Sequence, residues 1–239
     1  MHPAPQSCAL ILAAGLSIRM GGRPKALCLL QGYSFLEHCL QLFRQAGIGQ
    51  CVVVTGHEQE AIAGHARNIE RQLSGITVKT AYNTQFEQGM FSSIQTGLAA
   101  VQTLFPKARG CFLLPVDAPL VAPNTVRELY NHWKTLPNPD ANIILPACAG
   151  QTGHPPIIGR AHFTPVLACP AALGLRAYMA SLLDATQAKA LLSGQEVRTG
   201  PATLLSCISV QDDNITCDID TPVVLAQAER RHVGHFPWP

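Results

Sequence analysis

The chain has 239 residues, of which 47% are hydrophobic and 13% are charged, and its formal net charge at pH 7 is +2. This near-neutral balance gives no indication of nucleic acid or an anionic membrane as the main partner. A chain of this length and composition buries a large core, so we expect one domain over residues 1–239, with a core at about 8–230 and a tail at 232–239.

Short apolar runs alternate with segments of helical spacing along most of the chain. In chain order we expect a strand at residues 8–13, a loop at 15–24, a helix at 34–46, a strand at 50–55, a helix at 58–73, a strand at 76–81, a helix at 90–104, a strand at 110–116, a helix at 123–133, strands at 142–147 and 155–159, helices at 161–167 and 175–192, a strand at 203–210 and a helix at 222–231. Such alternation predicts an α/β fold with a mostly parallel sheet covered on both faces.

The cysteines and the apolar runs exclude several classes of protein. None of the nine cysteines forms a CxxC pair, so we expect neither a zinc site nor a disulfide framework. The first residues, MHPAPQSCALILAAG, lack a cationic segment, and no run approaches the roughly 18–20 apolar residues of a membrane span. We therefore expect a cytoplasmic protein without a signal peptide or a membrane anchor.

The loop after the first predicted strand reads LAAGLSIRMGGRPK, from Leu12 to Lys25. Small residues allow a ligand to approach the backbone at the edge of the sheet where α/β proteins bind ligands, and exposed N–H groups there attract phosphate. Arg19, Arg23 and Lys25 add positive charge. The loop is neither a Walker A motif nor GxGxxG. The alternative is an ordinary glycine-rich turn with solvated basic residues.

Carboxylates follow two later segments. Asp117 comes directly after an apolar strand, where a hard oxygen ligand suits Mg²⁺, although it could instead cap the turn before Pro119. Asp218 and Asp220 lie two residues apart, so an extended segment would place both on one face. Asp220 could alternatively cap the last helix.

These segments together resemble the MobA-like nucleotidyltransferase family, whose signature LAAGxSxRMG is followed by a lysine. The similarity continues through VVTGH at residues 53–57, Asn83, GMFSS at 89–93, PVDAP at 115–119, GHP at 153–155 and DIDTP at 218–222, and covers about residues 8–228. The family has Gly where this chain has Val116 before Asp117. The resemblance implies a Rossmann-like three-layer α/β/α sandwich of the nucleotide-diphospho-sugar transferase type.

The resemblance also implies roles for individual residues. Lys25, Arg19 and Asp117 would be catalytic, and Asp117, Asp220 and, less directly, Asp218 would bind Mg²⁺. Gly153 and His154 would line the acceptor side, although a lone histidine is more often structural, and Ser93 could equally cap a helix. The nucleotide would be bound by Leu12, Ala13, Ala14, Gly15, Ser17, Arg19, Lys25, Thr55, Gly56, Asn83, Ser92 and Ser93.

The expected reaction is attack of an acceptor phosphate on the α-phosphorus of a nucleoside triphosphate, with release of pyrophosphate. The family's cytidylyl branch shares Ala13-Ala14-Gly15, GHP and DIDTP with this chain, whereas its guanylyl branch begins LAGG. We therefore expect CTP as donor and molybdopterin as acceptor, with a molybdoenzyme or a chaperone as a further partner. The alternatives are guanylyl transfer, a sugar- or alditol-phosphate acceptor, and a nucleotide-binding module without catalysis.

Overall fold

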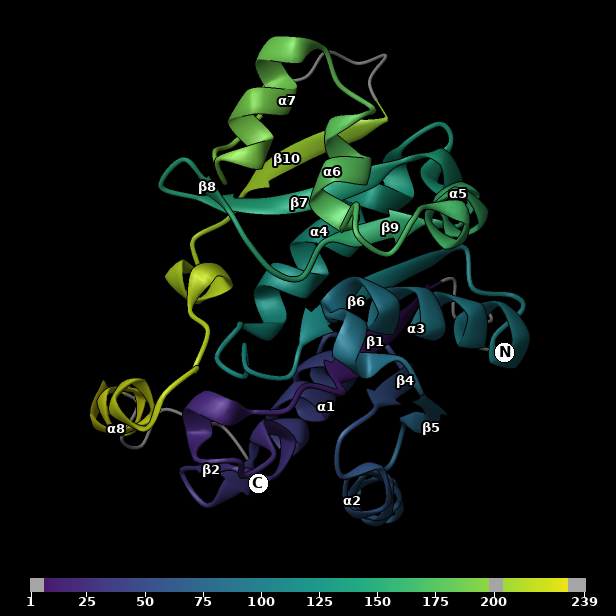
Figure 1. Ribbon diagram of the computed structural model, residues 1–239. Helices are drawn as coiled ribbons and strands as arrows, with labels where there is room; N and C mark the ends of the chain where they lie inside the picture. The colour runs from purple at the N-terminus through teal and green to yellow at the C-terminus, as the bar shows by residue number, and fades with distance from the viewer. Residues whose placement is uncertain (1–6, 198–203, 232–239) are drawn as a thin grey trace.

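The computed structural model describes residues 7–197 and 204–231 (Figure 1). Thr203, the first residue of the last expected strand, and the tail at 232–239 lie outside the described residues. Within the described part, no helix is long and apolar enough to cross a bilayer.

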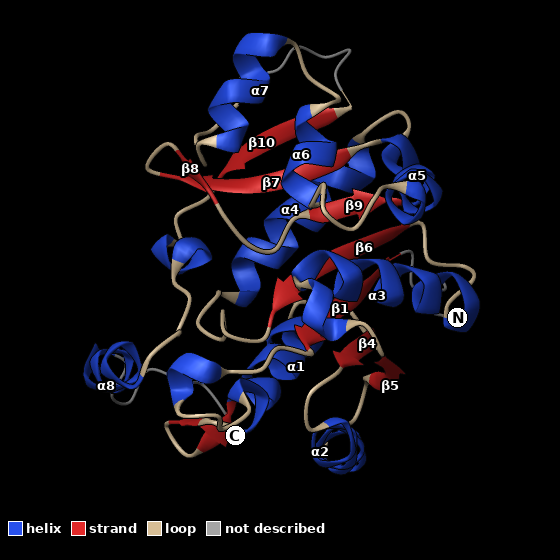
Figure 2. Ribbon diagram, viewed as in Figure 1, coloured by secondary structure: helices blue, strands red, loops and turns tan. Residues whose placement is uncertain are grey.

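A central sheet runs through the molecule in the strand order β10-β7-β9-β6-β1-β4-β5, with β8 paired to β7 (Figure 2). A separate hairpin joins β2 and β3. The strand bounds are β1 Ser7–Ala13, β2 Leu29–Leu30, β3 Tyr33–Ser34, β4 Gln50–Thr55, β5 Thr77–Tyr82, β6 Gly110–Pro115, β7 Ile143–Cys148, β8 Gln151–Thr152, β9 Ile157–Gly159 and β10 Leu205–Ser209.

Helices cover both faces of the sheet, so the expected three-layer α/β/α sandwich is confirmed. Helices α1, α2 and α4 share one apolar core with the sheet, and α3, α5, α6 and α7 share the other. The helix bounds are α1 Phe35–Gln45, α2 Gln59–Gln72, α3 Met90–Leu104, α4 Pro123–Thr135, α5 Phe163–Ala168, α6 Leu175–Ala180, α7 Ala185–Leu192 and α8 Pro222–Arg231. Alternate residues of a strand point to opposite faces, and β1 accordingly gives Ile11 to the first core and Leu10 to the second.

Strand direction determines which loops meet at one edge of the sheet. Strands β1, β4, β5 and β6 are mutually parallel, and β7 is parallel to β10. Strand β9 is antiparallel to both β6 and β7, so β7 points the same way as β6. The start of β9 therefore lies at the edge where the parallel strands end, and this brings the segment before β9 to the loop that follows β1.

Two features of the fold differ from the expectation. The single helix expected at 175–192 is wrong: it is two helices, α6 and α7, because the Asp184 side chain accepts the backbone N–H groups of Thr186 and Gln187 and so begins a new helix. The two-residue strands β2, β3 and β8 were not expected, since two residues are too few to show a period in the sequence.

Candidate active site

The loop after β1 carries the first residues of the site. Ser17 has a φ of 54°, and Gly21 and Gly22 have φ values of 70° and 79°, so three residues of the loop adopt the left-handed conformation. The chain thereby turns back on itself, and the Ser17 carbonyl accepts the N–H groups of Met20 and Gly22 at 2.9 and 3.3 Å. The Ser17 Oγ accepts the N–H of Lys25 at 3.0 Å, which fixes where the lysine leaves the loop.

Lys25 joins the loop to two carboxylates from distant parts of the chain. Its Nζ donates to Asp117 Oδ2 at 2.6 Å and also to Asp220 Oδ1. Arg19 Nη2 lies 2.7 Å from the other oxygen of Asp220. The structure therefore brings Arg19, Lys25, Asp117 and Asp220 into one charged cluster.

A backbone hydrogen bond positions the second carboxylate segment. The N–H of Ile219 donates to the carbonyl of Asp117 at 2.7 Å, and the Ile219 side chain is fully buried in the core beneath. Because Asp218 and Asp220 flank this buried anchor, both stand beside Asp117 although about a hundred residues separate them in the chain.

The charges of the cluster and the burial of its members shift their pKa values. Burial by itself would lower the pKa of Lys25, but hydrogen bonds and attraction from Asp117 and Asp220 outweigh it and raise that pKa, so the ammonium stays charged. Burial would raise the pKa of Asp220, yet Lys25 and Arg19 lower it. Although part of Asp218 is exposed to solvent, desolvation of its carboxyl and then repulsion by Asp117 and Asp220 raise its pKa to about 6.

A hollow of about 540 Å³ opens above the cluster, a size typical of small-molecule sites. The expected nucleotide contacts Leu12, Ala13, Ala14, Gly15, Ser17, Arg19, Lys25 and Ser93 line it, as do the expected metal ligands Asp117, Asp218 and Asp220. We call this hollow the loop cleft. Phe86, Glu87 and Met90 also line it. Phe86 and Glu87, which precede the GMFSS segment, were not predicted, because no motif in the sequence marks them.

Four other expected nucleotide contacts, Thr55, Gly56, Asn83 and Ser92, do not line the loop cleft. Asn83 is buried and donates through Nδ2 to the hydroxyls of Ser92 and Ser93, at 2.9 and 3.0 Å. The Asn83 Oδ1 accepts the N–H of Gln85 at 2.9 Å. These hydrogen bonds of Asn83 stabilise the turn that leads into α3.

Gly56 occupies a position where a side chain has no space. A Cβ there would lie 2.7 Å from the Ala14 carbonyl oxygen and 2.6 Å from Cβ of Phe86. The neighbouring N–H of His57 donates to the same Ala14 carbonyl at 3.1 Å. Gly56 thus allows the loop after β4 to pack against the loop after β1.

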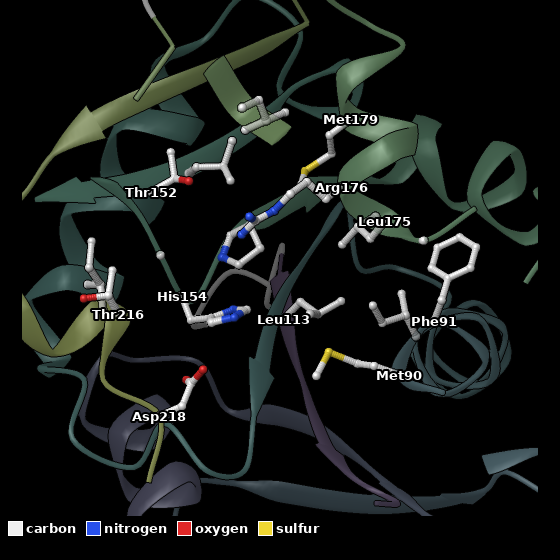
Figure 3. A pocket seen from close by; sticks show the side chains of 17 residues that line it. Met90, Phe91, Leu113, Thr152, His154, Leu175, Arg176, Met179, Thr216 and Asp218 are labelled. Carbon is white, nitrogen blue, oxygen red and sulfur yellow. The ribbon is translucent and has the colours of Figure 1, made fainter. Parts of the chain in front are cut away.

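A second hollow of about 450 Å³ adjoins the loop cleft, and we call it the side pocket (Figure 3). Both are lined by Met90, His154 and Asp218, so they meet at these residues. His154 lies at the start of the segment that enters β9, and Gly153 lines the side pocket next to it. Desolvation and then the charge of Arg176 lower the pKa of His154 to about 4, so the imidazole is neutral at pH 7.

The donor atoms of the cluster fit a hard divalent cation. Within residues 7–197 and 204–231, no three His, Cys, Asp or Glu side chains are grouped as a complete metal site. Mg²⁺, however, usually binds through one or two carboxylates together with substrate phosphates and water. Asp117 and Asp220 supply such a pair, and the ammonium of Lys25 already lies between them as a cation.

The family model described as the MobA-like NTP transferase domain matches residues 9–188. The molybdenum cofactor cytidylyltransferase of Escherichia coli K12 is 26% identical over 226 residues, which cover 93% of this chain and 95% of that protein. The bifunctional protein GlmU of Rhodococcus opacus is 29% identical over 160 residues, which are 66% of this chain. The matched regions make up only about a quarter to a third of the first curated relatives, 31% for this GlmU.

Solved structures show the same fold at low sequence identity. Rv0371c of Mycobacterium tuberculosis H37Rv superposes with a TM-score of 0.67 at 24% identity, covering 95% of this chain and 99% of that one. Its complex with manganese superposes with a TM-score of 0.65, again at 24% identity and covering 95% of this chain and all of that one.

Proposed function

The chain belongs to the MobA-like NTP transferase family, and from this premise we propose that it transfers a nucleotidyl group from a nucleoside triphosphate to the phosphate of a small acceptor. The observation that carries the proposal is the contact of Lys25, at the end of the loop after β1, with Asp117 and Asp220. A loop with exposed N–H groups, two basic side chains and a carboxylate pair provides what a triphosphate and its divalent cation require.

The chemistry needs positioning more than it needs a base. One oxygen of the acceptor phosphate attacks the α-phosphorus, a new P–O–P linkage forms, and the bond to the β-phosphate breaks with release of pyrophosphate. A phosphate with a second pKa near ~6 is largely a dianion at neutral pH, so the attacking oxygen carries no proton that must be removed. The protein's task is to align the two phosphates and to neutralise their charge.

Each residue of the charged cluster has a distinct part in this proposal. Lys25 and Arg19 stabilise charge on the triphosphate, together with N–H groups of the loop. Asp117 and Asp220 would hold Mg²⁺, and Asp218 stands next to them as a further oxygen donor. The cation, when bound, supplies Lewis-acid neutralisation of the phosphate oxygens. A manganese complex is known for a protein of this fold, Rv0371c, which supports a divalent cation.

CTP is the donor and molybdopterin the acceptor that we propose. The support is the cytidylyltransferase relative, which aligns with 93% of this chain, and the LAAG start of the loop. Ala14 lines the loop cleft, so its methyl group reduces the space beside the nucleotide. GTP as the donor and a sugar or alditol phosphate as the acceptor are the alternatives within the same reaction class. A non-catalytic nucleotide-binding module is the alternative from another class.

Pyrophosphate release tests the proposal. With Mg²⁺ and molybdopterin, CTP should be turned over faster than GTP, and Asp117→Asn should reduce kcat by at least about 100-fold, because the metal loses a charged ligand. The matched control is Asp213→Asn, an exposed carboxylate five residues before Asp218 that lines neither hollow. Equal turnover of CTP and GTP would reject the cytidylyl assignment. The absence of pyrophosphate release with every acceptor tested would reject a catalytic function.

A further inference from the structure

The side pocket has a chemical character that differs from that of the loop cleft. Its walls are mostly apolar, with Phe91, Leu113, Leu175, Met179, Leu191 and Ile215 among them. Charged side chains occur at two places, Asp218 where the side pocket meets the loop cleft, and Arg176 on α6. Figure 3 shows Arg176 extending from α6 into the space above His154, with Asp218 on the opposite side.

Arg176 has no partner within the described part of the chain: no hydrogen bond or ion pair joins it to residues 7–197 or 204–231. Its charge nevertheless acts on the pocket, because it contributes to the neutral state of His154. A guanidinium offers five N–H donors in a fork that suits carboxylate, phosphate or a pair of carbonyl oxygens. Arg176 is exposed to solvent, so its five donors are available to water and to a ligand that enters the side pocket.

His154 provides a second free polar atom at the junction of the two hollows. Its Nδ1 is buried and has no hydrogen-bond partner among the described residues. Buried polar atoms are normally paired, and an unpaired one at a cavity wall points to a ligand or water that completes it. Since the ring is neutral, it can donate or accept without adding charge beside the phosphates.

We propose, on the basis of the proposed transfer, that the side pocket binds the body of the acceptor and that Arg176 determines which acceptor is used. The acceptor is then a phosphate ester with three parts. Its phosphate reaches the loop cleft past His154, its body is apolar or a flat ring that packs on the methionine and leucine side chains, and a second anionic or carbonyl group at its far end binds Arg176.

This chemistry distinguishes between the acceptor classes left open above. A sugar or alditol phosphate carries hydroxyl groups along its whole length. Some of those hydroxyls could reach the polar side chains of Thr152, His154, Arg176 and Thr216, but the hydroxyls that face the apolar walls would lose water without gaining hydrogen bonds, which is unfavourable. A heterocyclic phosphate such as molybdopterin has a ring for the apolar walls and polar edges for the guanidinium. The side pocket therefore favours the heterocyclic class.

The test is a steady-state comparison of full-length variants with CTP and Mg²⁺, with molybdopterin and glucose 1-phosphate as the acceptors. Arg176→Ala should raise the KM for molybdopterin at least about 10-fold and leave the KM for CTP unchanged, because one charged hydrogen-bonding partner is lost. Arg176→Lys should give an intermediate KM, since it keeps the charge and loses the fork. Lys189→Ala, which removes an exposed cation of α7 outside both hollows, is the matched control.

The outcomes separate the two proposals. Pyrophosphate release that is unaltered in Arg176→Ala, or a lower KM for glucose 1-phosphate than for molybdopterin in the wild type, overturns the role of Arg176 and leaves the transfer reaction standing. A wild-type chain that releases no pyrophosphate with either acceptor overturns the proposed transfer, and the acceptor assignment falls with it.

Discussion

Neighbouring aspartates of the C-terminal segment have opposite roles, which depend on what their oxygens contact. Asp212 is buried, and its carboxylate accepts the N–H of Ala122 at 2.8 Å and the hydroxyl of Thr125 at 2.7 Å, so it caps the start of α4. Asp220, eight residues later, contacts Lys25 and Arg19 instead. The first carboxylate stabilises the fold, and the second belongs to the charged cluster that we propose for catalysis.

His154 makes a testable contribution to the pH dependence of stability. Its pKa is about 4 in the folded chain and about 6.5 when unfolded, so below pH 6.5 the unfolded chain binds the additional proton. Stability therefore falls as the pH is lowered from 7 to 5. His154 is partly buried, and we expect its titration to account for about 1–2 kcal/mol of the fall in the free energy of unfolding between pH 7 and pH 5.

Urea unfolding of the metal-free protein at pH 7 and pH 5 measures this contribution. His154→Gln removes the titrating group, so the variant should lose less stability between the two pH values than the wild type does. His57→Gln is the matched control, since its side chain is 35% exposed and its ring lies 3.8 Å from the exposed carboxylate of Glu58. The expectation fails if His154→Gln and the wild type lose equal stability.

At the scale of elements, the C-terminal segment is held against the sheet by close backbone contact. The N–H of His154 donates to the Ile215 carbonyl at 2.7 Å, and this links the entrance of β9 to the short helix η6, Asp213–Thr216. A Cβ on Gly153 would lie 2.2 Å from that same carbonyl oxygen. Glycine is required at this position because the two backbones touch.

Gly153→Ala should therefore be destabilising. The backbone of η6 must move away, which we expect to cost about 1–3 kcal/mol and to displace both His154 and the Asp218–Asp220 turn. Thermal unfolding and the KM for the acceptor measure the two effects. Gly64→Ala is the matched control, since a Cβ there meets only an arginine tip at 3.9 Å in α2 and should stabilise slightly. Equal melting temperatures for the two variants would contradict the packing argument.

At the scale of the whole molecule, the site joins segments from both ends of the chain. The loop cleft is built from the loop after β1, the end of β6 and the segment before α8, and the side pocket adds α6 and the entrance of β9. A ligand that spans these segments binds the folded chain only. Ligand binding must therefore raise the stability of the whole fold.

The thermal shift with nucleotide tests this coupling. At a hundred times its Kd, CTP with Mg²⁺ should add about 2.7 kcal/mol, which corresponds to roughly 5–10 °C in Tm for a chain of this size. GTP at the same concentration should give a smaller shift, and EDTA should reduce the shift of CTP, because the carboxylates then repel the phosphates. A shift that EDTA leaves unchanged would argue against a metal held by Asp117 and Asp220.

The sequence by itself determined the class of fold and the main ligand loop. Buried parallel strands are continuous apolar runs, and the residues of the loop after β1 are contiguous, so both are local signals that one sequence carries. The helix expected at 34–46 is a local signal too, and the structure begins it with Ser34 and Glu37, which exchange hydrogen bonds at 3.1 and 2.6 Å. The break at Asp184 was missed because an aspartate in a helical pattern can lie on the surface as well as cap.

Only the tertiary structure decided how the distant residues lie relative to one another. Lys25, Asp117 and Asp220 meet because the parallel strands end at one edge and Ile219 anchors its segment below Asp117. Asn83 and Ser92 lie inside a buried hydrogen-bond network, and Arg176 points into an apolar pocket. These arrangements depend on strand direction and on packing between segments far apart in the chain, which no local pattern of residues encodes.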